Sequence, residues 1–156
     1  MKEQKQDPSK LVVFTLGTSN RSREEFLEII KKHNIKQVID VRSFPKSKRF
    51  PHFDRENLAK LLTSAGIHYH WLGKELGGFR KGGYEKYMDT KEFEKGLKRL
   101  LQLIAQEKSV IVCAEKFPWK CHRRFISQKL ASMGVEVRHI IEKNRLWAPG
   151  KLLIKI

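Results

Sequence analysis

The feature that most constrains the fold is a regular alternation of short apolar runs with amphipathic helical segments. A β-branched apolar run covers residues 11–16, and a second covers residues 35–41. Between them, Ser22 and Glu25 form a capping box, which predicts a helix that continues to about His33. A strand, a helix and a second strand in this order favour a parallel pair, because a crossover of this length suits parallel strands.

The same alternation continues to residue 141. Three further apolar runs predict strands over residues 67–72, 109–113 and 135–141. Three further helices are expected, one capped by Asp54, one capped by Asp89 or Thr90, and one from about Cys121 to Met133. We therefore predict an α/β fold with a doubly wound, mostly parallel sheet of about five strands and helices on both faces.

The length and the ends of the chain suggest a single domain. A chain of 156 residues is long enough to bury a core without disulfides or metals. Residues 1–10 form a polar N-terminal tail, residues 11–141 the α/β domain, and residues 142–156 a C-terminal extension. The extension is compatible with an extra edge strand or with an oligomer contact, and the oligomeric state stays open.

The charge balance points to an anionic partner. Lysine and arginine number 33 against 17 aspartate and glutamate residues, which gives a formal net charge of +16. Such an excess predicts nucleic acid or a phosphate-bearing small molecule as partner. The alternative is a solvated, lysine-rich surface that serves solubility or thermal stability.

The sequence predicts a cytoplasmic protein with no membrane partner. No stretch approaches the roughly 18 apolar residues that span a bilayer, and residues 1–10 lack the apolar core of a secretory signal. The two cysteines are too few for a disulfide framework, and a reducing compartment keeps them as thiols. We recognise no cofactor motif and expect no cofactor.

Most of the unusual residues lie in four loops that follow predicted strands. These loops cover residues 17–22, 42–53, 73–87 and 114–120. The carboxyl ends of parallel strands meet at one edge of a sheet, and ligands bind there at the switch in strand order. We therefore expect the four loops to share one positively charged ligand site.

The first loop is a candidate anion site. Its free backbone N–H groups, hydroxyls and guanidinium lie before a helix N-terminus, where they could hold a phosphate. The candidate ligand-binding residues are Thr18, Ser19, Asn20 and Arg21. Ordinary turn and cap chemistry is the alternative.

The second loop mixes cations with aromatic residues, as a phosphate-binding and base-stacking surface would. Its candidate ligand-binding residues are Arg42, Lys46 and Arg49. Asp40 ends the preceding apolar strand, where a carboxylate must be either paired or functional. We favour a structural ion pair of Asp40 with Arg42 or another cation, and keep an acid/base or orienting role for Asp40 as the alternative.

The third loop is dense in glycine and predicts a mobile basic flap that closes over a ligand. Arg80 and Tyr84 are its candidate ligand-binding residues, and Phe79, Tyr84 or Trp119 could stack on a base. The alternatives are a flexible surface loop and, for Tyr84, packing in the core.

The fourth loop carries both thiols. Cys121 lies at a predicted helix N-terminus beside Lys120 and His122, so we expect its pKa to be lowered and Cys121 to be the better thiolate. Cys113 instead ends a buried strand, where a thiolate could sit in an anion cradle with Arg123 as oxyanion partner. The candidate catalytic residues here are Cys113, Cys121, Glu115 and His122, and the candidate ligand-binding residues are Lys116 and Arg123.

Three other interpretations of the thiols remain open. They could form a redox pair, they could be half of a metal site with His122, or Cys113 could be a small buried hydrophobe beside a non-covalent anion site. The spacing lacks the close ligand pair of zinc sites, and only His68 and His70 could complete one, so we predict no metal.

Several motifs together resemble the family catalogued as domain of unknown function 488 (DUF488). The resemblance rests on TLGTSNR at 15–21, DVRSFPKSKRFPHF at 40–53, LGG at 76–78, YEKYM at 84–88 and CAEKFPWKCHR at 113–123. It runs from about residue 11 to residue 141. This chain has Thr18 where the family pattern often has His, and Phe117 where it often has Asp. The first difference removes a possible base and the second a loop carboxylate. The resemblance implies no settled activity.

A more distant similarity concerns the order of elements around Cys113. A strand ending in Cys113, a loop, Arg123 and a helix are similar in order to rhodanese-like and cysteine phosphatase domains, although the loop is longer and lacks their glycine. We therefore expect a protein that binds nucleic acid or a nucleotide-like anion. The alternatives are a cysteine-dependent transferase or hydrolase acting on a small sulfur- or phosphorus-containing anion, and a non-catalytic interaction module.

Overall fold

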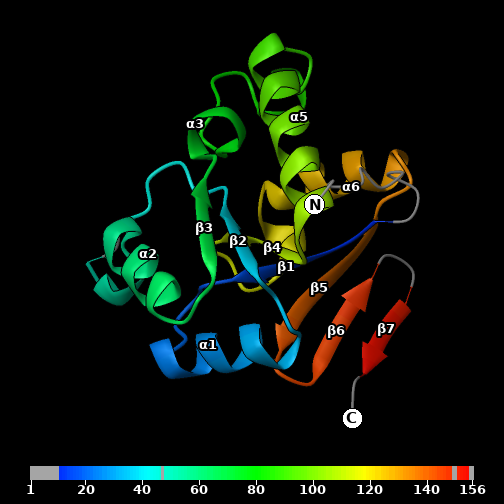
Figure 1. Cartoon of the computed structure of the whole chain (residues 1–156). Helices are drawn as coiled ribbons and strands as arrows, with labels where there is room; N and C mark the ends of the chain where they lie inside the picture. The colour runs from blue at the N-terminus through cyan, green and yellow to red at the C-terminus, as the bar shows by residue number, and fades with distance from the viewer. Residues whose placement is uncertain (1–10, 47, 149–150, 155–156) are drawn as a thin grey trace.

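The computed structural model describes residues 11–46, 48–148 and 151–154, which form one seven-stranded sheet with helices on both faces (Figure 1). The strands are β1 (Val12–Gly17), β2 (Gln37–Asp40), β3 (His68–Trp71), β4 (Ser109–Cys113), β5 (Glu136–Glu142), β6 (Arg145–Ala148) and β7 (Lys151–Ile154). Their order across the sheet is β3-β2-β4-β1-β5-β6-β7.

The predicted fold class is confirmed. Strands β3, β2, β4, β1 and β5 are parallel, as the helical crossovers require. Strands β6 and β7 follow β5 in antiparallel pairs, so the C-terminal extension enlarges the same sheet. The predicted N-terminal tail lies outside the described residues.

The four longer helices are α1 (Arg23–Lys32), α2 (Arg55–Ser64), α5 (Lys91–Gln106) and α6 (Arg123–Ser132). Two of them begin as the sequence predicts, because the Ser22 side chain accepts a hydrogen bond from the Glu25 N–H and the Thr90 side chain accepts one from the Phe93 N–H. The loops also contain short helical turns, which are η2 (Pro51–Phe53), α3 (Gly73–Leu76), α4 (Tyr84–Tyr87) and η3 (Pro118–Lys120).

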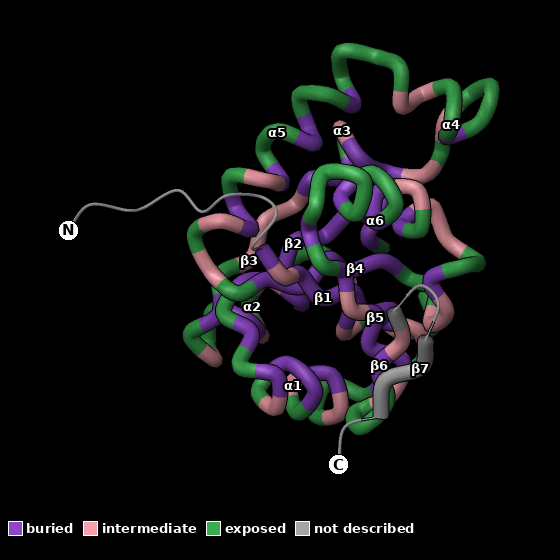
Figure 2. Tube along the Cα trace, turned by 90° about the vertical axis from the view of Figure 1, so that its right-hand side faces the viewer, coloured by how far each residue is buried: buried purple, intermediate pink, exposed green. Residues whose placement is uncertain are grey.

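Two apolar clusters pack on opposite faces of the sheet. One joins α1 and α2 to side chains such as Val110 and Val112 of β4. The other joins α5 and α6 to Ile111 and Cys113 of the same strand, because successive side chains of a strand point to opposite faces. Figure 2 shows the central strands β1, β2 and β4 buried almost throughout and the outer turns of the helices exposed. The Cys113 side chain therefore points toward the face covered by α5 and α6.

The chain changes direction between the neighbouring strands β1 and β4. From β1 it passes through α1 to β2, and from β4 it passes through α6 to β5 on the other side of the sheet. Such a switch point opens a crevice at the carboxyl ends of the two strands. Within the described part of the chain, no helix has the length and apolar content needed to cross a membrane.

Candidate functional site

A cleft of about 860 Å³ lies at the carboxyl ends of the parallel strands, and all four predicted loops contribute to its wall. Six predicted ligand-binding residues of the first two loops line it: Thr18, Ser19, Asn20, Arg42, Lys46 and Arg49. Five more predicted residues also line it: Cys113, Glu115, Lys116, Cys121 and His122. The expected convergence of the loops is therefore observed.

Gly17 allows the first and fourth loops to meet. It is the register partner of Cys113, and a Cβ atom on Gly17 would lie 1.9 Å from the carbonyl oxygen of Glu115. Beyond the strand ends, the Thr18 N–H donates to the Cys113 carbonyl and the Ser19 N–H donates to the Ala114 carbonyl, both at 2.8 Å. These contacts extend the β1–β4 pairing into the cleft and fix the main chain around Cys113.

Cys113 lies at the floor of the site, with Arg123 buried behind it. Arg123 begins α6, and its guanidinium is completely buried. Its Nη1 lies 2.7 Å from the Cys113 Sγ and 2.7 Å from the Glu115 carbonyl oxygen, and its Nη2 donates to the Lys116 carbonyl at 3.0 Å. One arginine therefore fixes the fourth loop and places a positive charge against the thiol. The sequence predicts Arg123 as a ligand-binding residue, but Arg123 does not line the cleft. It instead positions the fourth loop and the Cys113 thiol.

The two thiols have opposite pKa shifts, and the prediction that Cys121 is the better thiolate is wrong. Burial raises the pKa of Cys113, but the hydrogen bond from Cys121 and the charge of Arg123 outweigh it, so the pKa is lowered. The hydrogen bond that Cys121 donates to Cys113, together with its burial, raises the pKa of Cys121. The decisive factor is the direction of the Arg123 side chain, which points to Cys113.

His122 contacts Cys121 as a neutral imidazole. Burial lowers its pKa, and the charges of Arg123 and Arg80 lower it further. Its Nε2 lies 3.0 Å from the Val41 carbonyl oxygen, which can only accept, so this nitrogen carries the proton. The Nδ1, 3.4 Å from the Cys121 Sγ, is then left as a proton acceptor.

Asp40 has the structural role that the sequence favoured, and its alternative role in catalysis has no support. Its carboxylate is completely buried, and it accepts hydrogen bonds from the Arg42 Nε at 2.9 Å, the Arg42 Nη2 at 2.8 Å and the Tyr69 hydroxyl at 2.7 Å. The Arg42 backbone N–H adds a fourth at 3.1 Å. Asp40 does not line the cleft, because these donors enclose it.

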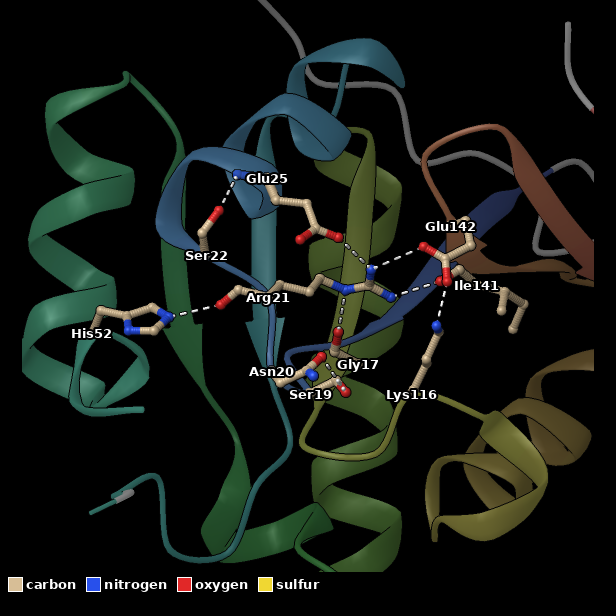
Figure 3. A network of polar contacts seen from close by, with 10 residues as sticks. All are labelled: Gly17, Ser19, Asn20, Arg21, Ser22, Glu25, His52, Lys116, Ile141 and Glu142. Carbon is tan, nitrogen blue, oxygen red and sulfur yellow. Dashed lines mark hydrogen bonds and ion pairs between the residues drawn. The ribbon is translucent and has the colours of Figure 1, made fainter. Parts of the chain in front are cut away.

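Arg21 does not face the cleft, in contrast to its prediction as a ligand-binding residue. Its guanidinium donates to the Gly17 carbonyl at 2.9 Å, to the Ile141 carbonyl at 2.7 Å and to the Glu25 carboxylate at 3.1 Å (Figure 3). Arg21 therefore ties the first loop to the end of β5. Glu142 completes the network, as it lies 3.7 Å from Arg21 and also pairs with Lys116.

Arg80 and Tyr84 are also absent from the described wall of the cleft. Tyr84 is buried, and its hydroxyl donates to the Leu76 carbonyl at 2.8 Å, so the alternative of core packing holds. Arg80 donates to the carbonyls of Gly77 and Lys74, and its guanidinium lies 3.8 Å from the centre of the Tyr87 ring. Both side chains stabilise the third loop internally.

Gly73, Gly77 and Gly78 of the third loop serve close packing, whereas Gly82 and Gly83 are not closely packed and have positive φ. A Cβ atom on Gly78 would lie 2.7 Å from the His122 Nδ1, so only glycine lets the loop approach this ring. The Phe79 N–H, which is next in the chain, donates to the Ser43 Oγ at 3.3 Å. The predicted mobile flap is thus, at this point, a segment packed against the second and fourth loops.

The sequence singled out Phe79 for stacking and gave the aromatic residues of the second loop, which include Phe44, the same role, but it did not predict that Phe44 and Phe79 pair. The two rings lie 5.5 Å apart at the cleft, and their side chains are 78% and 74% exposed. Phe117 also lines the cleft and stacks on Trp119 at 5.0 Å, with Lys120 beside it. The cations between aromatic residues in loops two and four were the available signal, but which rings stay exposed depends on the fold.

The predicted absence of a metal site stays a prediction. Among residues 11–46, 48–148 and 151–154, no three His, Cys, Asp or Glu side chains gather as metal ligands do. His68 and His70, which could have completed a zinc site, lie on β3, and His68 pairs with Glu107 at 2.7 Å.

Comparison with known proteins gives one match. A family model described as "Domain of unknown function DUF488" matches residues 22–130. This span begins at the N-cap of α1 and ends within α6, so it contains the second, third and fourth loops of the cleft. Comparisons with curated proteins and with solved structures gave no significant match.

Proposed function

Because the chain belongs to the DUF488 family, a domain of unknown function, we propose its function from the cleft: it binds a ligand that combines phosphate with an aromatic base. Single-stranded nucleic acid and nucleotides share this chemistry. The observation that carries the proposal is that exposed cations and an exposed pair of phenylalanine rings line the same cleft.

The aromatic residues support a base-stacking role. Phe44 and Phe79 keep about three quarters of their side-chain surface in water, at 74% and 78% exposed. Large apolar side chains exposed together often mark a binding surface. Stacking of one base on an aromatic ring contributes about 1–3 kcal/mol in single-strand binding sites, with little dependence on sequence.

The distribution of charge supports phosphate binding. Arg42 and Lys116 also line the cleft, but they are paired with Asp40 and Glu142 respectively. Three other cations of the wall are exposed and take part in none of the ion pairs among the described residues: Lys46, Arg49 and Lys120. These three side chains are placed to contact phosphates without first breaking an internal pair.

A salt series with labelled single-stranded DNA, single-stranded RNA and a mononucleotide tests the proposal by fluorescence anisotropy. The triple variant Lys46→Ala, Arg49→Ala, Lys120→Ala should bind oligonucleotide more weakly and with a flatter dependence on salt, because fewer counterions are released. The matched control removes the same charge from α5 and α6 through Lys95→Ala, Lys98→Ala and Lys129→Ala, which are exposed positions outside the cleft. Equal losses of affinity in the two triple variants would show that binding depends on net charge alone and not on the cleft.

The two phenylalanines give an independent test. Phe44→Ala with Phe79→Ala should weaken binding of a base-containing ligand about tenfold, whereas inorganic phosphate should be unaffected. A mononucleotide that binds as well as the oligonucleotide would identify a nucleotide site. Absence of binding by every nucleotide and oligonucleotide at low salt contradicts the proposal.

The contact between Arg123 and Cys113 favours a second candidate function, a cysteine-dependent transferase or hydrolase. In it, the Cys113 thiolate attacks a small sulfur- or phosphorus-containing anion at the cleft floor. Thiosulfate with cyanide as acceptor, and aryl phosphates, are the probes. Turnover lost in Cys113→Ser and kept in Cys121→Ser supports this candidate, and no turnover with either probe class opposes it.

A further inference from the structure

We propose that Cys113 and Cys121 form a redox-active dithiol, which a small hydroperoxide oxidises to an intramolecular disulfide. This activity goes beyond the proposed ligand binding and does not depend on it. It requires a thiolate nucleophile, a second thiol in reach of it, a proton acceptor for that thiol, and access from solvent.

The two sulfur atoms already face each other. The Cys121 Sγ lies 2.9 Å from the Cys113 Sγ and donates a hydrogen bond to it. Cys113 ends β4, and Cys121 follows η3, so the fourth loop folds back to bring the two together. Pro118 at the start of η3 is buried, and the Cys121 N–H donates to its carbonyl at 3.2 Å, which fixes this return.

Arg123 makes Cys113 the attacking thiol. Its Nη1 lies 2.7 Å from the Cys113 Sγ, which favours the thiolate over the thiol. Cys121 has no such contact with a guanidinium among the described residues, and its pKa is raised by its hydrogen bond to Cys113. One thiol is thus prepared to react first and the other keeps its proton, as a sequential mechanism needs.

The chemical steps balance. The Cys113 thiolate attacks the terminal oxygen of the hydroperoxide and the O–O bond breaks, which gives a Cys113 sulfenic acid and an alkoxide, or hydroxide when the probe is hydrogen peroxide. This leaving group takes a proton from solvent and departs as an alcohol or as water. The Cys121 sulfur then attacks the Cys113 sulfur, forming the S–S bond and expelling hydroxide, which leaves as water. The Cys121 proton passes to the neutral Nδ1 of His122, 3.4 Å away, and from there to the departing oxygen. The two thiols lose two electrons and the peroxide gains them.

Burial restricts the oxidant. Cys113 is only 1% exposed, although it borders the cleft, whereas Cys121 is partly exposed. A bulky protein disulfide would have to reach the buried sulfur, but a hydroperoxide of only a few heavy atoms can reach it from the cleft. Small hydroperoxides are therefore the substrate class, and a soluble dithiol is the class of reductant that returns two electrons to the pair.

The test uses the full chain, reduced and freed of reductant, and then treated with hydrogen peroxide at pH 7. We expect a loss of two thiols per chain by thiol titration, an intact mass lower by two hydrogen atoms, and no covalent dimer. Dithiothreitol should restore both thiols. A product in which the disulfide joins two chains, or a rate no faster than that of free cysteine, overturns the proposal.

Two serine variants separate the roles of the thiols. Cys121→Ser should stop at a Cys113 sulfenic acid, which dimedone traps, because no second thiol attacks it. Cys113→Ser should lose its remaining thiol about tenfold more slowly than the parent loses its first, since Cys121 lacks the arginine contact. Equal rates in the two variants overturn the assignment. If Cys113→Ser does not fold, the trapped adduct of Cys121→Ser still decides the outcome, because its absence contradicts the proposal.

Discussion

The neighbouring strands β2 and β4 both end in a buried acidic side chain that faces a buried arginine, yet the two acids differ in chemistry. Asp40 of β2 is a carboxylate that Arg42 and Tyr69 enclose with four hydrogen bonds. Cys113 of β4 is a thiol that meets Arg123 on one side and Cys121 on the other, and it borders the cleft.

The difference separates a structural ion pair from a reactive one. A carboxylate is charged in water at neutral pH and needs its arginine permanently when buried. A thiol is mostly neutral in water at that pH and becomes charged only because of its surroundings. The same Arg–acid geometry therefore stabilises the fold at the end of β2, and tunes reactivity at the end of β4.

The largest expected effect separates the two pairs by stability. Arg42→Met leaves the buried Asp40 charge without its partner, which should cost about 3–5 kcal/mol in the free energy of unfolding. Arg123→Met lets Cys113 return to a neutral thiol, so only the hydrogen bonds to the Glu115 and Lys116 carbonyls are lost, at about 1–3 kcal/mol. Urea unfolding at pH 7 compares the two variants. A larger loss in Arg123→Met would reverse the comparison.

Only part of this contrast could be predicted from the sequence. The parallel sheet, the four loops at one edge and the ion pair of Asp40 with Arg42 follow from apolar periodicity and from the cost of a buried carboxylate. The direction in which a long side chain points could not be predicted from the sequence. Arg21 and Arg123 lie in loops or at a helix start, as binding residues do, but both turn inward to backbone carbonyls.

Tertiary contacts also decided which thiol is activated. From sequence, Cys121 has Lys120 and His122 directly beside it, whereas the nearest cation to Cys113 is Lys116, three residues along the chain. The fold reverses this order because the guanidinium of Arg123, ten residues along the chain, reaches Cys113. Likewise, the contact between Phe44 and Phe79 joins rings from two different loops, which no local pattern encodes.

The second prediction concerns a titratable group, His139, whose pKa is lowered by burial and by the charge of Arg123. His139 of β5 is buried, and burial together with the charge of Arg123 lowers its pKa to about 3. The pKa of an unfolded histidine is about 6.5. The unfolded chain therefore binds more protons between these values, so the stabilisation is present above pH 6.5 and is lost as the pH falls toward 3.

Urea unfolding from pH 7 to pH 4 measures this loss, which should reach a few kcal/mol. His139→Gln is the matched variant, because it retains a polar side chain but does not titrate. Its stability should depend less steeply on pH over this range, whatever its stability at pH 7. A parallel pH dependence in both proteins would show that other groups control acid unfolding.

The third prediction sharpens the comparison through reactivity. Arg123→Lys replaces the planar guanidinium with a shorter-reaching point charge, so the thiolate at Cys113 should be less stabilised. In a Cys121→Ser background, the pH at which iodoacetamide alkylation is half-maximal should rise by about one unit. The alkylation rate at pH 7 should fall by up to about tenfold. Arg42→Lys in the same background is the control, and an equal rise there would mean that general charge, not contact, sets the pKa.

The smallest expected effect links the thiol pair to the proposed ligand. Closing the disulfide removes the thiolate charge from the cleft floor, while the cations of the wall, such as Lys46 and Arg49, keep theirs. An anionic ligand should then bind about threefold more tightly to the oxidised chain, since one repulsive charge at screened distance contributes well under 2 kcal/mol. Anisotropy titrations of the oxidised and reduced protein with the same oligonucleotide measure the change.

The control for this effect is the double variant Cys113→Ser, Cys121→Ser, whose affinity should not respond to peroxide. A disulfide that forms completely but leaves the affinity unchanged would separate the two activities, since it would mean that the ligand's phosphates lie away from the floor, near Lys120 and the outer wall. Weaker binding after oxidation would instead indicate that Arg123 moves once the thiolate is gone. The fourth loop, which Arg123 contacts through the Glu115 and Lys116 carbonyls, would then move away from the ligand. Asp40 at the end of β2 offers no comparable test, because Arg42 and Tyr69 enclose its carboxylate and peroxide does not oxidise a carboxylate.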